Sequence, residues 1–140
     1  MSKVAIVFWS ATGNTETMAN CIAEGAGANG NLVPCAEMTP AKLAEFDVVA
    51  FGCPAMGAEQ LEESEFEPMF AALEGSLNGK KIALFGSYGW GDGEWMRDWT
   101  TRMEAAGATV LNGEGLICHE TPDEDGLSEC RELGIQLANA

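Results

Sequence analysis

An apolar run passes into a helical pattern through the loop Ser10-Ala11-Thr12-Gly13-Asn14-Thr15. The run covers residues 4–9, so the order is strand, hydroxyl-rich loop, helix. A helix N-terminus presents unpaired backbone N–H groups and the positive end of the helix dipole, and the loop side chains add neutral donors there. The loop is therefore interpreted as an anion cradle, with an ordinary helix cap as the alternative.

The loop has no basic side chain, since no Lys or Arg occurs between Lys3 and Lys42. A nucleoside triphosphate loop needs the Lys of G-x-x-x-x-G-K-[ST], whereas Gly13 is followed by Asn14, Thr15 and Glu16. This excludes an ATPase or GTPase of that class. A single phosphomonoester fits better, because about five or six N–H and O–H donors at a helix start can satisfy it.

Composition predicts one globular domain over residues 1–140, with 46% apolar residues to form its core. The net charge is −15, which disfavours nucleic acid and anionic lipid and favours a basic protein partner. Residues 4–9 are too short for a membrane span or a signal peptide, so a cytoplasmic protein without membrane contact is expected. The five cysteines show no metal-ligand spacing, so reduced thiols and no metal site are expected.

Further apolar runs cover residues 32–35, 48–53, 82–87 and 110–117, and stretches with helical spacing separate them. Runs that are apolar throughout indicate a parallel sheet covered on both faces, hence an α/β fold. Five strands and five helices match a doubly wound sheet of order 2-1-3-4-5, a known arrangement that these residues alone do not determine. In such sheets ligands lie beyond the carboxyl ends of the strands, so the loops after residues 9 and 53 should share one ligand.

Residues 25–30 spell G-x-G-x-x-G, the fingerprint of dinucleotide-binding loops. The fingerprint must follow a strand and open a helix, whereas here it ends a helix and precedes a strand. These glycines are therefore predicted to terminate the helix.

Two further loops each present one large side chain that can pack against a flat ring. They are Pro54-Ala55-Met56-Gly57-Ala58-Glu59-Gln60 and Tyr88-Gly89-Trp90-Gly91-Asp92-Gly93. Met56 and Trp90 can enclose a planar conjugated ring through sulfur–aromatic and stacking contacts. Together with a phosphate in the first loop, this predicts a mononucleotide ligand, with Met56 and Trp90 as ordinary core residues the alternative.

Three segments together resemble a short-chain flavodoxin of the clostridial and rumen-anaerobe type, over essentially the whole chain. They are residues 10–15, residues 52–57 with Glu59, and residues 85–91 with Gly93-Glu94-Trp95. The resemblance implies flavin mononucleotide (FMN), held noncovalently by an electron carrier that is not an enzyme and has no catalytic residues. It also implies low-potential transfer of single electrons, mainly through the semiquinone/hydroquinone couple.

The resemblance also implies roles for individual residues. Ser10 to Thr15 correspond to the phosphate loop with Ser87 as a further neighbour, and Met56 and Trp90 correspond to the residues that flank the flavin. The Gly57 carbonyl corresponds to the group that turns toward flavin N5 on reduction, and Glu59 to the acceptor of the flavin N3–H. Within the phosphate loop, the implied contacts include Ala11, Thr12, Gly13 and Asn14. Outside it, the other residues implied to contact FMN are Pro54, Ala55, Ala58, Tyr88, Gly89, Gly91 and Asp92.

Two alanines depart from the commoner family pattern. Ala11 stands where relatives often have Gly, and Ala58 where Gly, Asp or Ser often follows the switch glycine. The first is expected to be harmless. The Cβ of Ala58 is expected to change how favourable the flipped turn is, because such turns need positive φ at one residue.

The excess of carboxylates affects both the expected protein partners and the redox potential expected for the cofactor. Carboxylates at residues 59–67 and 120–125 are expected to disfavour a further negative charge on the cofactor, with a merely solvated acidic surface as the alternative. They are also expected to steer a monomer onto basic surfaces of redox enzymes, with enzymes that use ferredoxin as the expected partners. A small FMN-dependent reductase on the same fold is the alternative function. A phospho-acceptor receiver domain is excluded, because the third strand ends Gly52-Cys53-Pro54 without the required Asp.

Overall fold

The computed structural model describes residues 2–11, 13–56, 60–89 and 91–140, and within them a parallel sheet forms the centre of the molecule. Its strands are β1 (Val4–Phe8), β2 (Gly30–Pro34), β3 (Val48–Gly52), β4 (Lys81–Tyr88), β5 (Thr109–Val110) and β6 (Leu116–His119). The order is β2-β1-β3-β4-β5, and β6 also pairs with β4. The predicted α/β fold with strand order 2-1-3-4-5 is confirmed.

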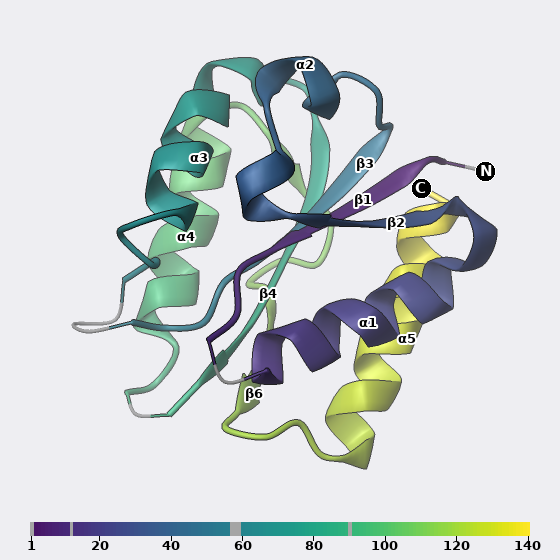
Figure 1. Ribbon diagram of the computed structural model, residues 1–140, viewed down its shortest axis with the longest axis vertical. Coiled ribbons are helices and arrows are strands. Elements are labelled where there is room, and N and C mark those ends of the chain that lie inside the picture. The colour runs from purple at the N-terminus through teal and green to yellow at the C-terminus, as the bar shows by residue number, and fades with distance from the viewer. Residues whose placement is uncertain (1, 12, 57–59, 90) are drawn as a thin grey trace.

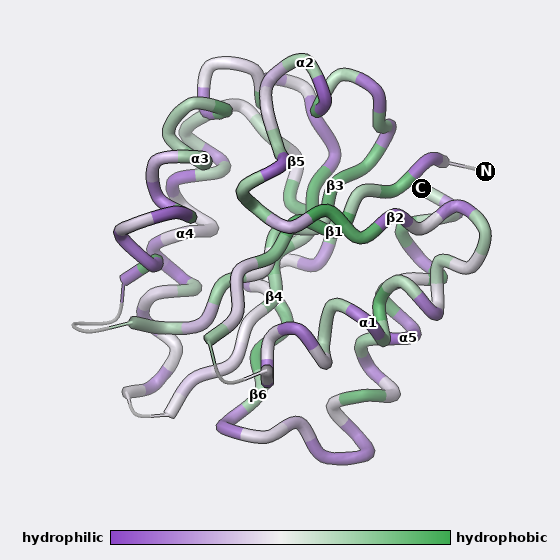
Figure 2. Tube along the Cα trace, in the orientation of Figure 1, coloured by the Kyte–Doolittle hydropathy of each residue, from purple (hydrophilic) through white to green (hydrophobic). Residues whose placement is uncertain are grey.

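Helices cover both faces of the sheet (Figure 1). On one face lie α1 (Asn14–Ala26) and α5 (Glu124–Ala138), and on the other lie α2 (Pro40–Leu43), α3 (Phe66–Leu73) and α4 (Glu94–Ala105). Single-turn helices η1 (Gly27–Asn29), η2 (Cys35–Glu37) and η3 (Glu74–Ser76) complete the connections. Alternate side chains of each central strand enter opposite cores, which explains why these strands are apolar throughout (Figure 2).

The fifth strand differs from the prediction of one strand over residues 110–117. Two short strands, β5 and β6, pair with β4 instead, and five residues separate them where β4 has two. Asn112 replaces the missing ladder bonds: its Oδ1 accepts from the Leu84 N–H (3.2 Å) and its Nδ2 donates to the Leu84 carbonyl (2.8 Å). Gly115 has φ +90°, a conformation outside a strand, so the apolar run cannot continue as one element.

Helices α1 and α5 approach closely at two glycines. A Cβ on Gly134 would lie 2.0 Å from the Ile22 carbonyl oxygen, and one on Gly25 would lie 2.0 Å from the Arg131 carbonyl oxygen. Gly27, with φ +63°, ends α1, which confirms the predicted termination by glycine. Gly25 instead lies inside α1, so for this residue the prediction was wrong, and the helix crossing is the reason for its small size.

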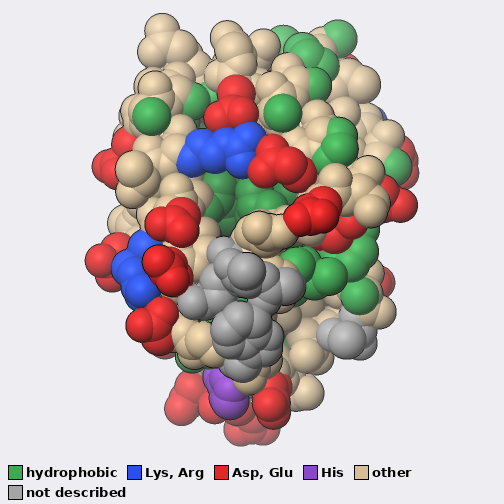
Figure 3. Space-filling model, turned by 90° about the vertical axis from the view of Figure 1, so that its left-hand side faces the viewer, with side chains coloured by type: hydrophobic (Ala, Val, Ile, Leu, Met, Phe, Trp, Pro, Cys, Tyr) green, Lys and Arg blue, Asp and Glu red, His purple; other side chains and the backbone are tan. Residues whose placement is uncertain are grey.

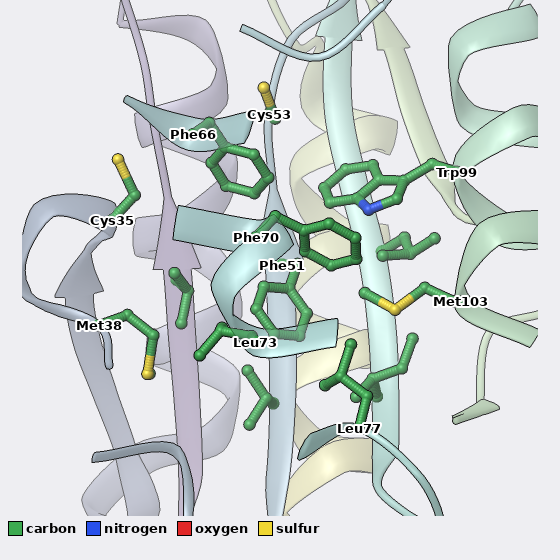
Figure 4. Close-up of a cluster of buried hydrophobic side chains, with 14 of the residues drawn as sticks. Cys35, Met38, Phe51, Cys53, Phe66, Phe70, Leu73, Leu77, Trp99 and Met103 are labelled. Atoms are coloured by element: carbon green, nitrogen blue, oxygen red, sulfur yellow. The ribbon is translucent and has the colours of Figure 1, made fainter. Parts of the chain in front are cut away.

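An aromatic cluster fills the core under α3 and α4 (Figure 4). The Trp99 ring packs edge-on against Phe66 (5.4 Å between ring centroids) and Phe70 (5.9 Å). Arg102 lies over the Phe70 ring and pairs with both Glu67 and Glu74 at 2.7 Å. This guanidinium therefore joins α4 to α3 and to the turn that follows it.

Candidate functional site

A cavity of about 290 Å³ lies at the carboxyl ends of the strands, where four connections meet. Its lining comprises Ser10, Ala11, Asn14, Thr15, Pro54, Ala55, Met56, Ser87, Tyr88, Gly89 and Glu120. The loops after β1, β3 and β4 are thus brought together around one space, as the switch point of the sheet requires. A wider hollow of about 520 Å³ lies against α5 and contains none of the described residues predicted for the site.

The other predicted residues divide into two groups. Thr12, Gly57, Ala58, Glu59 and Trp90 lie outside the described residues. Gly13, Gly91 and Asp92 are described but are not part of the cavity lining. Gly13 and Gly91 have positive φ, and Asp92 pairs with Arg97 at 2.9 Å, so within the described part of the chain these three shape the loops rather than the wall.

The loop before α1 combines a helix cap with a row of donors. The Ser10 Oγ accepts from the N–H groups of Gly13 (3.2 Å) and Glu16 (3.3 Å). Gly13 adopts φ +94°, where a Cβ would be strained, and this turn starts the helix. A hydroxyl that accepts twice still keeps its own proton to donate. The cap and cradle interpretations therefore coexist, because Asn14 and Thr15 also line the cavity.

A buried hydroxyl pair fixes two of the loops relative to each other. Thr15 Oγ1 lies 3.0 Å from Ser87 Oγ and accepts from the Ser87 N–H at 3.4 Å. Both side chains are almost fully buried. The start of α1 is thus tied to the end of β4, two points far apart in the sequence.

The loop after β3 is anchored at both ends. The N–H groups of Cys53 and Ala55 donate to the carbonyls of Phe85 (3.2 Å) and Ser87 (3.0 Å), so the chain follows β4 past the end of β3. Met56 and Gln60 then exchange two backbone hydrogen bonds, of 2.8 and 3.0 Å. The predicted switch residues lie between these anchors, outside the described residues, and their roles stay predictions.

Glu120 lines the cavity but is absent from the residues predicted for it. Its N–H donates to the Tyr88 carbonyl at 2.7 Å, and its φ of +57° is the one left-handed non-glycine conformation among the described residues. β6 is parallel to β4, so the residue that follows β6 reaches the same edge of the sheet. The rule that carboxyl ends of parallel strands meet at one edge could have found it.

The carboxylates expected beside the site include two that are bound within the fold. Glu62 is 6% exposed, and its carboxylate accepts from the N–H groups of Ser64 (2.7 Å), Glu65 (2.7 Å) and Phe66 (2.9 Å). Burial alone would raise the pKa of this carboxyl, but these hydrogen bonds outweigh burial and lower the pKa. Glu67 is paired with Arg102. These two residues are structural, whereas Glu63 and Glu65 are exposed.

Replacing Glu62 by Gln is expected to lower the free energy of unfolding at pH 7 by about 1–3 kcal/mol. Both carboxylate oxygens accept hydrogen bonds, and the amide NH₂ group of Gln cannot accept. Because the folded-state pKa is lowered, this stabilisation is present above the unfolded value of about 4.3 and is lost as the pH falls through the folded value.

Urea unfolding at pH 7 and below pH 4 measures this effect, with the exposed Glu45→Gln as the matched control. The loss caused by Glu62→Gln should shrink at the lower pH, while Glu45→Gln stays close to the unsubstituted protein at both. Equal stability of the two variants at pH 7 would show that the hydrogen bonds of Glu62 do not stabilise the start of α3.

Comparison with known proteins agrees with this geometry. A family model described as flavodoxin matches residues 6–134. The chain is 49% identical to a flavodoxin from Megasphaera elsdenii, covering 98% of this chain and 99% of that one, and 47% identical to one from Clostridium beijerinckii, covering 96% and 98%. The solution structure of two-electron reduced Megasphaera elsdenii flavodoxin superposes with a TM-score of 0.86 at 48% identity, covering 98% of this chain and 99% of that chain. The chain therefore belongs to the flavodoxin family, whose members are FMN-binding electron carriers.

Proposed function

We propose that this chain carries single electrons at low potential on noncovalently bound FMN, held in the cavity beyond the carboxyl ends of β1, β3 and β4. The observation that carries the proposal is the meeting of these three loops around one space at the N-terminus of α1. FMN supplies the group that accepts and releases the electron. The chain supplies the residues that bind it, orient it and set its electrostatic surroundings.

The described residues fit such a ligand in their chemistry. Ser10, Asn14 and Thr15 offer neutral donors beside a helix N-terminus, which suits a phosphate. Pro54, Ala55 and Met56 offer an apolar wall, which suits a flat ring. We propose that the other residues implied by the family resemblance contact FMN as well, including the five that lie outside the described part.

Negative charge supports a low potential. Glu120 lies in the cavity wall, and no Lys or Arg side chain is among the described lining residues. Arg97, Arg102 and Arg131 are each paired with carboxylates, and Figure 3 shows basic side chains on the α3 and α4 face lying against acidic ones. A further negative charge on the cofactor therefore meets little local compensation.

The same charge supports docking to basic surfaces of redox enzymes, and we place those that use ferredoxin first among the candidates. The net charge of −15 favours such encounters at low salt. The five cysteines are free and buried, which suits a reducing compartment and supports a place in the cytoplasm. We propose separately that the protein acts as a monomer. Among the described residues, no helix is both long and apolar enough to cross a membrane.

Stepwise reduction of the FMN-loaded protein tests the proposal. The visible spectrum is recorded against a reference dye of known potential while electrons are added. We expect two separate one-electron steps, with half-reduced flavin accumulating between them and the second step well below the potential of free FMN. One two-electron step near the free-flavin potential would instead favour the reductase alternative, which the family comparisons do not favour.

A further inference from the structure

His119, the chain's single histidine, bonds to the loop that follows β4. It ends β6 in register with Tyr88, and its ring lies 5.0 Å from the Tyr88 ring, centroid to centroid. Its Nε2 lies 3.2 Å from the carbonyl oxygen of Gly89. A carbonyl oxygen can only accept, so Nε2 carries the proton in this contact, which sets the tautomer of the neutral ring.

The residue that His119 holds belongs to the wall of the cavity. β4 ends at Tyr88, so Gly89 is the first residue beyond the strand ladder, and both residues line the cavity. A Cβ placed on Gly89 would meet no described atom within 4 Å, so no described neighbour packs against that side of the residue. The hydrogen bond from His119 constrains the residue at its carbonyl.

The adjacent residue completes a two-point attachment. The Glu120 N–H donates to the Tyr88 carbonyl at 2.7 Å, one residue before the carbonyl held by His119. Glu120 keeps its left-handed φ of +57° in doing so. A strained backbone conformation of this kind persists where the surrounding contacts determine it. The segment at residues 119–120 thus attaches to the segment at residues 88–89 by backbone and side chain together.

We infer that His119 is a positioning residue for the FMN site: its Nε2–H fixes the Gly89 carbonyl and thereby holds the wall at residues 88–89 in the shape that receives the cofactor. The inference rests on the proposed function. Loss of the hydrogen bond should free this wall in the empty protein, and FMN binding must then order it again, which weakens the affinity.

A second way in which His119 could affect FMN is by charge alone. The ionisable groups that face it are Tyr88 on β4, Glu120 beside it, and Asp123, Asp125 and Glu129 around the hollow it shares with α5. A protonated ring among these acids would attract the FMN phosphate at low pH only. The hydrogen bond to Gly89 forms with the neutral Nε2–H ring and with the protonated ring, so positioning acts at both pH extremes.

Two substitutions separate the effect of the His119 hydrogen-bond donor from the effect of its ring contact with Tyr88. His119→Phe keeps a ring against Tyr88 and removes the donor, whereas His119→Gln keeps an N–H donor at a similar reach. FMN dissociation constants are measured by quenching of flavin fluorescence at pH 6 and at pH 8.5, where imidazole is ordinarily neutral. Urea unfolding of the FMN-free proteins verifies that each variant is folded.

We expect His119→Phe to weaken FMN binding about three- to tenfold at both pH values, and His119→Gln to stay within about twofold of the unsubstituted protein. Unchanged affinity in His119→Phe would overturn the inference, as would a loss seen only at pH 6 or equal losses in both variants. A His119→Phe variant that does not fold while His119→Gln binds normally would assign the residue to the fold and would also overturn it. Absence of FMN binding by the unsubstituted protein would instead contradict the proposed function.

Discussion

Asn14→Asp is expected to weaken FMN binding at least about a hundredfold while leaving the fold equally or more stable. Asn14 is the first residue of α1 and lines the cavity, so the new carboxylate occupies the region proposed for the phosphate. Two unit charges about 4 Å apart repel by about 4 kcal/mol at an effective dielectric constant of 20, and a phosphomonoester carries more than one. The same carboxylate interacts favourably with the helix dipole, which stabilises α1.

Asn20→Asp is the matched control, because it makes the same chemical change on an exposed residue of the same helix, outside the cavity lining. FMN dissociation constants and urea unfolding are measured for both variants. Weaker FMN binding together with equal or higher stability of Asn14→Asp distinguishes an effect on binding from damage to the fold. Equal FMN affinity of Asn14→Asp and Asn20→Asp would show that the phosphate does not bind at the start of α1.

Gly134→Ala is expected to lower the free energy of unfolding by about 2–4 kcal/mol, even though Ala is the better helix former by about 1 kcal/mol. The added Cβ would lie 2.0 Å from the Ile22 carbonyl oxygen and 2.8 Å from the Ala26 nitrogen. Both atoms belong to the backbone of α1, so no side-chain rotation relieves the overlap. The two helices must separate along their contact.

Gly75→Ala is the control, since no described atom lies within 4 Å of a Cβ there and the residue does not have positive φ. Urea unfolding followed by circular dichroism gives both values, and Gly75→Ala should stay within about 0.5 kcal/mol of the unsubstituted protein. Gly134→Ala with the same stability as Gly75→Ala would contradict the close approach of α1 and α5.

The α/β fold could be predicted from the sequence because β1, β3 and β4 are apolar on both faces. Segments with the apolar spacing of helices separate these strands along the chain. The division of the last strand into β5 and β6 could not be predicted. The Asn112 side chain takes the place of two backbone hydrogen-bond partners, and a pattern of apolar residues does not reveal such a contact. Gly25 was misassigned for a related reason. Glycine is required there by the close approach of Arg131 in α5, more than a hundred residues further along the chain.

The sequence predicted every described residue of the cavity lining except Glu120. The donors at residues 10–15 precede a helix and could be recognised as a unit. Glu120 and His119 belong to no such local unit, because their positions depend on β6 pairing with β4, and only the rule that carboxyl ends of parallel strands meet at one edge leads to them. Glu62 is one acid among several in the sequence, yet its carboxylate accepts from three backbone N–H groups in the turn that leads into α3 and is not part of a charged surface.

Binding of FMN through its phosphate is tested by measuring the affinity of the FMN-free protein for FMN and for riboflavin. Riboflavin has the same ring and ribityl chain but no phosphate, so the comparison isolates the cradle at residues 10–15. The proposed site predicts one FMN per chain and riboflavin binding weaker by about a hundredfold or more, because charge-assisted hydrogen bonds to the phosphate are lost. Equal affinity for the two flavins, or no binding of either, would contradict it.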